Sequence, residues 1–210
     1  MENNIRKGFL EDGPYHKMIA QSPELWFRSI VDCGRTYGWR ISELLNMQVN
    51  QIDLVQRVFR LEPGTTKNGE GREVVMTDAI FKLLSACVHD KSADDYVFTR
   101  ANGKRVRDFR KKWESACEVA GVPGLLFHDL RRTAARNLRR AGVPETVIMK
   151  IGGWRTRSVF ERYAIVSRND IADAMLLLQN SEKVNDAQIG HIIGHSDTPT
   201  QTGTLPHTVN

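Results

Sequence analysis

The spacing of hydrophobic and polar positions predicts a chain that is mostly helical. From Ser22 onward, apolar residues recur three or four positions apart in segments that glycine or proline separates. This spacing puts the apolar residues on one face of a helix, which can then cover a core. We expect helices over residues 22–31, 41–45, 78–88, 105–120, 129–141, 144–151, 156–164 and 169–179.

Residues 52–76 follow a different pattern. β-forming residues alternate in part from Ile52 to Leu61, and Pro63-Gly64 ends the run. A polar turn at residues 67–71 then separates two short extended arms, as in a β-hairpin. The fold class expected is mainly α (α+β), a helical domain with a small three-stranded antiparallel sheet.

The two ends of the chain differ from its middle. Residues 1–21 are polar, with breakers at Gly8 and Gly13-Pro14, and are interpreted as an arm or linker remnant. Residues 22–180 form the expected domain, and residues 181–210 are expected to be a disordered tail. In that tail, His191 and His195 could share a helix face, but no third ligand is evident, so no metal site is predicted.

Composition narrows the class of protein. The 210 residues carry a formal net charge of +5, which favours polyanionic partners such as nucleic acid. Three cysteines lie far apart without a C-x-x-C pair, which argues against a disulfide framework and a zinc site. No signal peptide and no apolar run of roughly 18 residues is evident, so we expect a cytoplasmic protein that does not enter a membrane.

Candidate chemistry begins with charged residues beside predicted turns and helix starts. Arg40 opens a helix with Glu43 one turn later, which places a guanidinium where an anion could bind. Lys67 precedes the hairpin turn and could protonate a leaving oxygen if the tip reaches a cleft. His128 and Arg131 are three apart and share a helix face, so together they could hold one phosphate.

Two aromatic residues complete the set. Trp154 follows Gly152-Gly153 and offers one indole N–H donor. Tyr163 carries a phenol, which has a pKa of about 10 and needs a positive environment to attack at neutral pH. Taken one at a time, these candidates have simpler interpretations. Arg40 and Glu43 could be a surface ion pair, Lys67 a solvated turn residue, and the aromatic residues packing residues. Their common order is what indicates a phosphate-reacting site.

These motifs together resemble the catalytic domain of the tyrosine recombinases, the phage-integrase family. The resemblance runs over roughly residues 7–178 and rests on GWRISELLNM, TKNGEGREVVM, DDYVFTRANGK, FHDLRRTAA and IGGW…FERYA. It implies the fold of DNA breaking-rejoining enzymes, with Tyr163 as nucleophile and Glu43 in a supporting role. The other catalytic residues it implies are Arg40, Lys67, His128, Arg131 and Trp154. Most members have histidine where Trp154 stands, and tryptophan there can donate a hydrogen bond but cannot do acid–base work.

The resemblance also implies an activity and partners. The expected activity is site-specific DNA recombination, such as integration or excision of a phage or other mobile element, through a 3′-phosphotyrosyl intermediate. It would use no metal, ATP or other cofactor, and the chain has no G-x-x-x-x-G-K-[ST] loop. The expected partners are double-stranded DNA at the nucleoid and three further copies of the chain, joined in a homotetramer through the helix at 169–179.

Contacts to DNA beyond the site are predicted from charge. The candidates are Arg100, Lys104, Arg105, Arg107, Arg110, Lys111, Arg132 and Arg136. Two alternatives remain open for the function. One is a nicking-closing enzyme resembling type IB topoisomerases, and the other is a non-catalytic DNA-binding remnant of a mobile element. The filled catalytic positions argue against the remnant, whereas the short stretch before residue 22 argues for it, because family members carry an N-terminal DNA-clamping domain.

Overall fold

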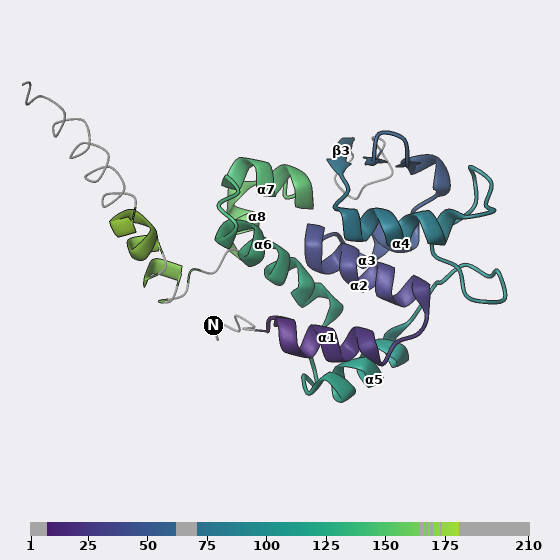
Figure 1. Ribbon diagram of the computed structural model, residues 1–210, viewed down its shortest axis with the longest axis horizontal. Coiled ribbons are helices and arrows are strands. Elements are labelled where there is room, and N and C mark those ends of the chain that lie inside the picture. Colours follow the sequence, from purple (N-terminus) through teal and green to yellow (C-terminus); the bar gives the residue numbers. More distant parts are fainter. Residues whose placement is uncertain are drawn as a thin grey trace, which may run out of the picture. The chain divides into compact units, whose positions relative to one another are not determined.

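The computed structural model divides into two units, residues 1–165 and residues 166–210, which are described separately. It describes residues 8–61, 71–163, 166, 168, 170–172 and 174–180. The first unit holds all the elements labelled in Figure 1. Lys67 and the pair His191 and His195 lie outside the described residues, as does the whole segment 181–210.

The first unit is built from short helices and one small sheet. The helices are α1 (Asp12–Ala20), α2 (Leu25–Tyr37), α3 (Ile41–Leu45), α4 (Asp78–Val88), α5 (Arg110–Ala120), α6 (Leu130–Arg140), α7 (Glu145–Gly152) and α8 (Arg157–Glu161), with 3₁₀ turns η1 (Val49–Gln51) and η2 (Phe127–Asp129). The strands β1 (Ile52–Asp53), β2 (Val58–Leu61) and β3 (Arg72–Val75) pair antiparallel in that order, with Phe59 opposite both Ile52 and Val74. The predicted fold class is confirmed.

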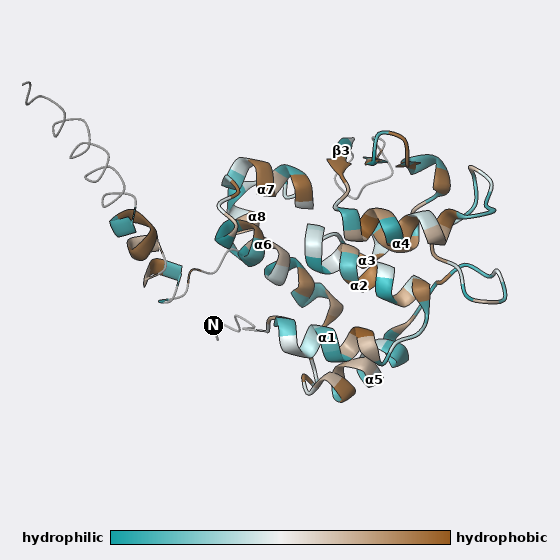
Figure 2. Cartoon of the chain, viewed as in Figure 1, coloured by the Kyte–Doolittle hydropathy of each residue, from teal (hydrophilic) through white to brown (hydrophobic). Residues whose placement is uncertain are grey.

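The core is organised around α2, which packs against both α4 and α6. Hydrophobic and hydrophilic residues alternate along α2, α4 and α5, as expected for helices with one buried face (Figure 2). Phe27 of α2 is fully buried and meets Phe109 edge-to-face with 5.9 Å between ring centroids. Phe109 meets Phe127 in the same way at 5.5 Å, so aromatic contacts join α2 to the residues that begin α5 and α6.

Helix α6 takes part in two hydrophobic clusters. Its first residue, Leu130, belongs to the main core, whereas Ala135 packs with Ile148, Trp154 and Phe160 in a second cluster. Tyr163 lies against this second cluster. Packing on α6 therefore fixes the candidate residues that follow α7 and α8 relative to those at the start of α6.

The segment interpreted as an arm or linker is part of the folded unit. Helix α1 packs against α5, and Leu10 and Met18 are fully buried. The Tyr15 hydroxyl donates to the Asp32 carboxylate at 2.6 Å. The Gly13-Pro14 pair was interpreted as a breaker, but it lies in the first turn of α1, where proline loses no intrahelical hydrogen bond.

Several helix boundaries differ from prediction, and the largest difference is in α2, which runs over Leu25–Tyr37 rather than 22–31 and continues through Gly34. Helix α5 starts at Arg110 rather than at residue 105, since the Asp108 carboxylate accepts from the Arg110 amide at 2.9 Å. Residue 105 instead pairs with Thr99 in an isolated β-bridge. Helix α8 ends at Glu161 rather than at residue 164, so Tyr163 lies in the turn after it.

The second unit contains helical residues between 168 and 180. Several of its large apolar side chains are exposed, namely Ile171, Met175, Leu176, Leu177 and Leu178. Within the part of the chain that the structure describes, no helix has the length and apolar content to cross a membrane.

Candidate active site

Arg40 and Glu43 lie at the start of α3. Arg40 is the N-cap residue, and its amide donates to Glu43 Oε2 at 3.2 Å while its Nη1 donates to Glu43 Oε1 at 3.1 Å. The Glu43 side chain is 3% exposed, whereas that of Arg40 is 20% exposed. The buried carboxylate therefore holds a guanidinium that still reaches the surface, as an anion-binding arginine requires.

Arg131, in the first turn of α6, is the most deeply buried charge of the site, at 1% exposure. Its Nη1 donates to the carbonyl oxygens of Gly38 and Gly152, the second at 3.2 Å. Burial and the nearby positive charge of Arg40 lower the pKa of Arg131 to about 10, so the guanidinium is still charged at neutral pH. The fold thus keeps a cation in place with only part of its hydrogen-bonding capacity used.

Trp154 packs directly on the end of α7. A β-carbon at Gly152 would lie 1.9 Å from the Trp154 ring, so only glycine permits this packing. Gly153 closes the turn with φ of +66°, a left-handed conformation that favours glycine. The Arg131 guanidinium lies 4.4 Å from the centre of the Trp154 ring, and the ring is 3% exposed. The two glycines therefore place the indole beside the buried cation.

His128 and Tyr163 are joined by a hydrogen bond. His128 Nε2 and Tyr163 Oη lie 2.9 Å apart, with either able to donate depending on the imidazole tautomer. Partial burial, and then the charge of Arg131, lower the pKa of His128, so the neutral imidazole predominates at pH 7. A neutral imidazole at this distance can accept the proton of the tyrosine hydroxyl.

Buried donors without partners converge on the same region. Nε and Nη2 of Arg131 and Nε1 of Trp154 have no hydrogen-bond partner among the described residues. Tyr163 lies close to both residues, since its ring centre is 5.4 Å from the Arg131 guanidinium and 5.8 Å from the Trp154 ring centre. Burying such donors unpaired is costly, which indicates that the site is arranged to receive an acceptor such as an anionic oxygen.

One residue of the site was missed in the sequence. Arg72, the first residue of β3, donates through Nη2 to Glu43 Oε2 at 3.0 Å. Its side chain is 6% exposed, and burial lowers its pKa while Glu43 opposes that shift. A signal was available, because strand alternation puts residue 72 on the same face as Val74, which is buried.

Comparisons with known proteins agree with this geometry. The model of the phage integrase family matches residues 13–170. The chain belongs to the phage integrase family. It is 28% identical over 181 residues to the integrase of Salmonella phage P22, a match that covers 81% of this chain and 46% of that protein. The chain thus spans about half the length of this curated relative.

Solved structures show the same integrase-family fold. The XerA recombinase matches with a TM-score of 0.67 and 22% identity, covering 81% of this chain and 63% of that one. The catalytic domain of bacteriophage HP1 integrase matches with a TM-score of 0.59 and 23% identity. That second match covers 80% of this chain and 93% of the HP1 domain, so the fold shared is that of a catalytic domain.

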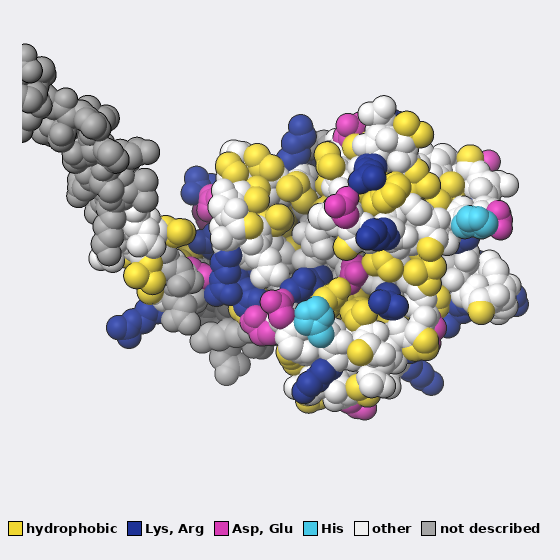
Figure 3. Space-filling model, in the orientation of Figure 1, with side chains coloured by type: hydrophobic (Ala, Val, Ile, Leu, Met, Phe, Trp, Pro, Cys, Tyr) yellow, Lys and Arg dark blue, Asp and Glu magenta, His cyan; other side chains and the backbone are white. Residues whose placement is uncertain are grey.

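Six of the candidate catalytic and supporting residues of this family member lie close together, and Lys67 is outside the described residues. The candidate DNA contacts are more dispersed. In the space-filling view, Lys and Arg side chains are spread over the visible face among acidic and hydrophobic ones (Figure 3). Charge alone therefore does not outline a DNA-binding surface on that face. The candidate DNA-contact residues differ instead in their exposure and in their contacts within the protein.

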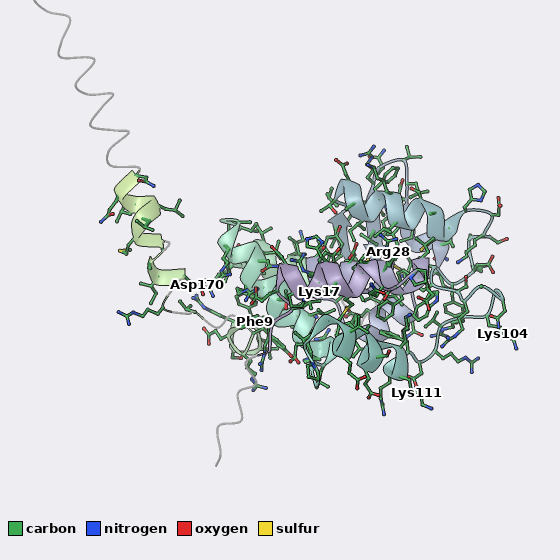
Figure 4. The ribbon with its side chains drawn as sticks, turned by 60° about the horizontal axis from the view of Figure 1, so that its bottom comes forward. Phe9, Lys17, Arg28, Lys104, Lys111 and Asp170 are labelled. Atoms are coloured by element: carbon green, nitrogen blue, oxygen red, sulfur yellow. The ribbon has the colours of Figure 1, made fainter. Side chains whose placement is uncertain are left out.

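Those contacts divide the predicted DNA-binding residues. Arg107, Arg110, Lys104 and Lys111 are exposed, and Lys104 and Lys111 point away from the body of the molecule (Figure 4). Arg136 is instead an internal residue at 8% exposure, with both Nη atoms on the Glu11 carboxylate at 2.5 and 2.9 Å.

The other three candidates have partners in the protein or are partly buried. Arg105 donates to the Leu45 carbonyl at 3.1 Å, and Arg100 donates to the Asp108 carbonyl at 2.8 Å. Arg132 is half-buried, and its Nη1 has no partner within the described segments. Five of the eight candidates are therefore exposed, Arg100 among them, whereas Arg136 is buried, and contact with DNA stays a prediction for each.

Proposed function

We propose that this chain is the catalytic domain of a tyrosine recombinase, which breaks and rejoins DNA by transesterification. The observation that carries the proposal is the Tyr163 hydroxyl, which lies 2.9 Å from the His128 imidazole. Beside it, buried donors of Arg131 and Trp154 lack partners among the described residues. A nucleophile, a proton acceptor and a cationic pocket are what attack on a phosphodiester requires.

The residues divide the reaction between them. Tyr163 Oη attacks the phosphorus of the scissile phosphate. A bond forms between Oη and the phosphorus, which stays on the 3′ oxygen of the strand, and the bond from phosphorus to the 5′ oxygen breaks. Neutral His128 accepts the phenolic proton, and Lys67 is proposed to give a proton to the leaving 5′ oxygen. Arg40, Arg131 and the Trp154 indole stabilise the charge that develops on the phosphoryl oxygens.

Rejoining reverses these steps. The free 5′-hydroxyl attacks the phosphotyrosine, and the Tyr163 phenolate leaves and recovers its proton. Because the bond energy of the strand is kept in the phosphotyrosine, we expect no need for ATP. The charge stabilisation is assigned to side chains, so we also expect cleavage to proceed in EDTA without added cofactor.

The proposed partners are double-stranded DNA and other copies of the chain. On the described helical part of the second unit, large apolar side chains are between 51% and 70% exposed, namely Ile171, Met175, Leu176, Leu177 and Leu178. Exposed apolar side chains clustered on one helical segment favour docking to another protein surface. We propose that this segment joins protomers, with a homotetramer formed on DNA as the expected assembly.

A suicide substrate tests the proposal. A nicked duplex that loses a short 5′-hydroxyl fragment after cleavage traps the protein covalently on DNA. We expect the wild-type chain to form this adduct and Tyr163→Phe to form none, with DNA affinity nearly unchanged because one hydroxyl is lost. An adduct with the phenylalanine variant would refute the nucleophile assignment.

That assay, plasmid relaxation and the joining of two sites together separate the alternatives. Binding of DNA without any adduct would favour a non-catalytic remnant. Relaxation of supercoiled plasmid by single protomers, without joining of two sites, would favour a topoisomerase-like enzyme. Joining of two marked DNA sites is the result expected of a recombinase.

A further inference from the structure

Arg72 lies between two parts of the candidate site that are distant in sequence. Its Nη2 donates to Glu43 Oε2 at 3.0 Å, and its guanidinium lies 5.4 Å from the centre of the Trp39 ring. A β-carbon on Gly153 would lie 2.5 Å from Arg72 Nη1. The side chain therefore occupies the space between the start of α3 and the turn that carries Trp154.

Glu43 shares its two oxygens between two arginines. Oε1 accepts from Arg40 Nη1 at 3.1 Å, whereas Oε2 accepts from the Arg40 amide at 3.2 Å and from Arg72. With the carboxylate 3% exposed, water can replace little of this hydrogen bonding. The Arg72 bond therefore fixes the plane of the carboxylate, and with it the direction in which Oε1 holds the Arg40 guanidinium.

We propose that Arg72 is a positioning residue for Arg40. It holds Glu43 in the orientation that aims the Arg40 guanidinium at the reacting phosphate, and it does so without touching DNA. The inference rests on the proposed function, because Arg40 is assigned there to stabilise the phosphoryl oxygens.

Loss of Arg72 has a direct consequence for Arg40. Glu43 Oε2 would lose its side-chain donor, and the carboxylate could then rotate to engage Arg40 through both oxygens. Such a pairing would draw the Arg40 guanidinium, which is 20% exposed, toward the interior. A shift of about 1 Å in a catalytic group can lower a rate by about 10²-fold, so the effect should be seen in cleavage rather than in binding.

The test is a double-mutant cycle on single-turnover cleavage. Adduct formation on the nicked suicide substrate is measured at saturating protein for wild type, Arg72→Met, Arg40→Ala and the double variant. We expect Arg72→Met to slow cleavage by about 10–10²-fold while the dissociation constant for DNA changes by less than about twofold. In the Arg40→Ala background the same substitution should change the rate by less than about twofold, because the group it positions is gone.

Two further variants serve as controls for the double-mutant cycle. Arg60→Met removes an arginine of the neighbouring strand β2 that is 47% exposed and paired with Asp53, so it should leave cleavage unchanged. Arg72→Lys keeps the charge but has one nitrogen in place of three, so it should recover cleavage only in part. Melting temperature is measured for every variant, and Arg72→Lys carries the test if Arg72→Met does not fold.

Each outcome bears on one proposal. Equal slowing by Arg72→Met in both backgrounds, or none in the wild-type background, would overturn the positioning role. Equal cleavage by Arg72→Lys and wild type would also overturn it. Failure of the wild-type chain to form an adduct would instead count against the proposed function.

Discussion

His128 and Tyr163 are 35 residues apart in the chain, and their polar side-chain atoms lie 2.9 Å from each other. The imidazole comes from the 3₁₀ turn before α6, and the phenol comes from the turn after α8. The turn that carries His128 contacts α6, and Tyr163 lies against the second hydrophobic cluster. The fold thus places an imidazole within hydrogen-bond distance of the hydroxyl that is proposed to attack DNA.

The pH dependence of cleavage should follow His128. Burial and the charge of Arg131 lower the pKa of this imidazole from 6.5. The neutral form that accepts the phenolic proton should therefore persist below pH 6.5 and be lost only at a lower pH. We expect single-turnover adduct formation between about pH 5 and 8 to show an acidic limb with an apparent pKa under 6.5.

The variant His128→Gln should be slower and should lose that acidic limb, since the amide does not titrate. An unchanged acidic limb in His128→Gln would assign that limb to another group.

The lowered pKa of His128 also makes the stability of the fold depend on pH. The unfolded chain binds this proton more readily, so the contribution of His128 to folding is present above about pH 6.5 and is lost as pH falls below it.

The unpartnered indole N–H of Trp154 gives a second prediction. Trp154→Phe removes the donor and keeps an aromatic ring against Phe160. A hydrogen bond to a charged group contributes about 1.5–3 kcal/mol, so we expect cleavage to slow by about 10–10²-fold. Trp154→His, which restores a ring N–H, should cleave faster than Trp154→Phe. Equal rates for the two variants would show that Trp154 acts through packing alone.

Leu10 tests the place of the N-terminal segment in the fold. Its side chain is fully buried, and its amide donates to Thr133 Oγ1 of α6 at 3.0 Å. We expect Leu10→Ala to lower the free energy of unfolding by about 2–5 kcal/mol, as for other buried leucines. The control is Val55→Ala, at a side chain that is 90% exposed, which should change it by less than about 0.5 kcal/mol. Similar small effects from both would mean that residues 8–11 are a detachable arm.

The helical pattern and the candidate catalytic residues could be predicted because both are encoded locally. The range of α4 was predicted to the residue, since Thr77 caps it and its apolar positions repeat at helical spacing. Arg40, His128 and Tyr163 could be identified as candidates because each lies in a sequence motif beside a predicted helix start or end. What motifs do not contain is which of their atoms remain unpaired after folding, as Arg131 Nε and Trp154 Nε1 do within the described residues.

What the sequence does not predict depends on tertiary contacts that no local pattern reports. Residues 8–20 look polar, yet the few apolar ones among them, such as Leu10 and Met18, are the ones that are buried. Arg136 reads as one more cation on a basic helix, but its partner Glu11 lies 125 residues away. Arg72 is a different case, because strand alternation with buried Val74 indicates an inward side chain, and only its partner Glu43, from another element, has no local signal.

The division of the basic residues by their contacts gives the last prediction. Lys104 and Lys111 are exposed and point outward (Figure 4), whereas Arg136 is buried and paired with Glu11. Each lysine that neutralises a phosphate releases about one counterion when DNA binds. Lys104→Gln and Lys111→Gln should therefore each weaken DNA binding and make the slope of log K against log salt shallower by about 1. Arg136→Gln should leave this slope unchanged and lower the melting temperature, because it removes a buried guanidinium that pairs with both oxygens of Glu11. Fluorescence anisotropy over a salt series measures the slope, and melting curves of the same preparations measure the melting temperature.

A shallower slope for Arg136→Gln with an unchanged melting temperature would show that this arginine leaves Glu11 to bind phosphate. Unchanged slopes for both lysine variants would place the DNA on a different surface of the domain.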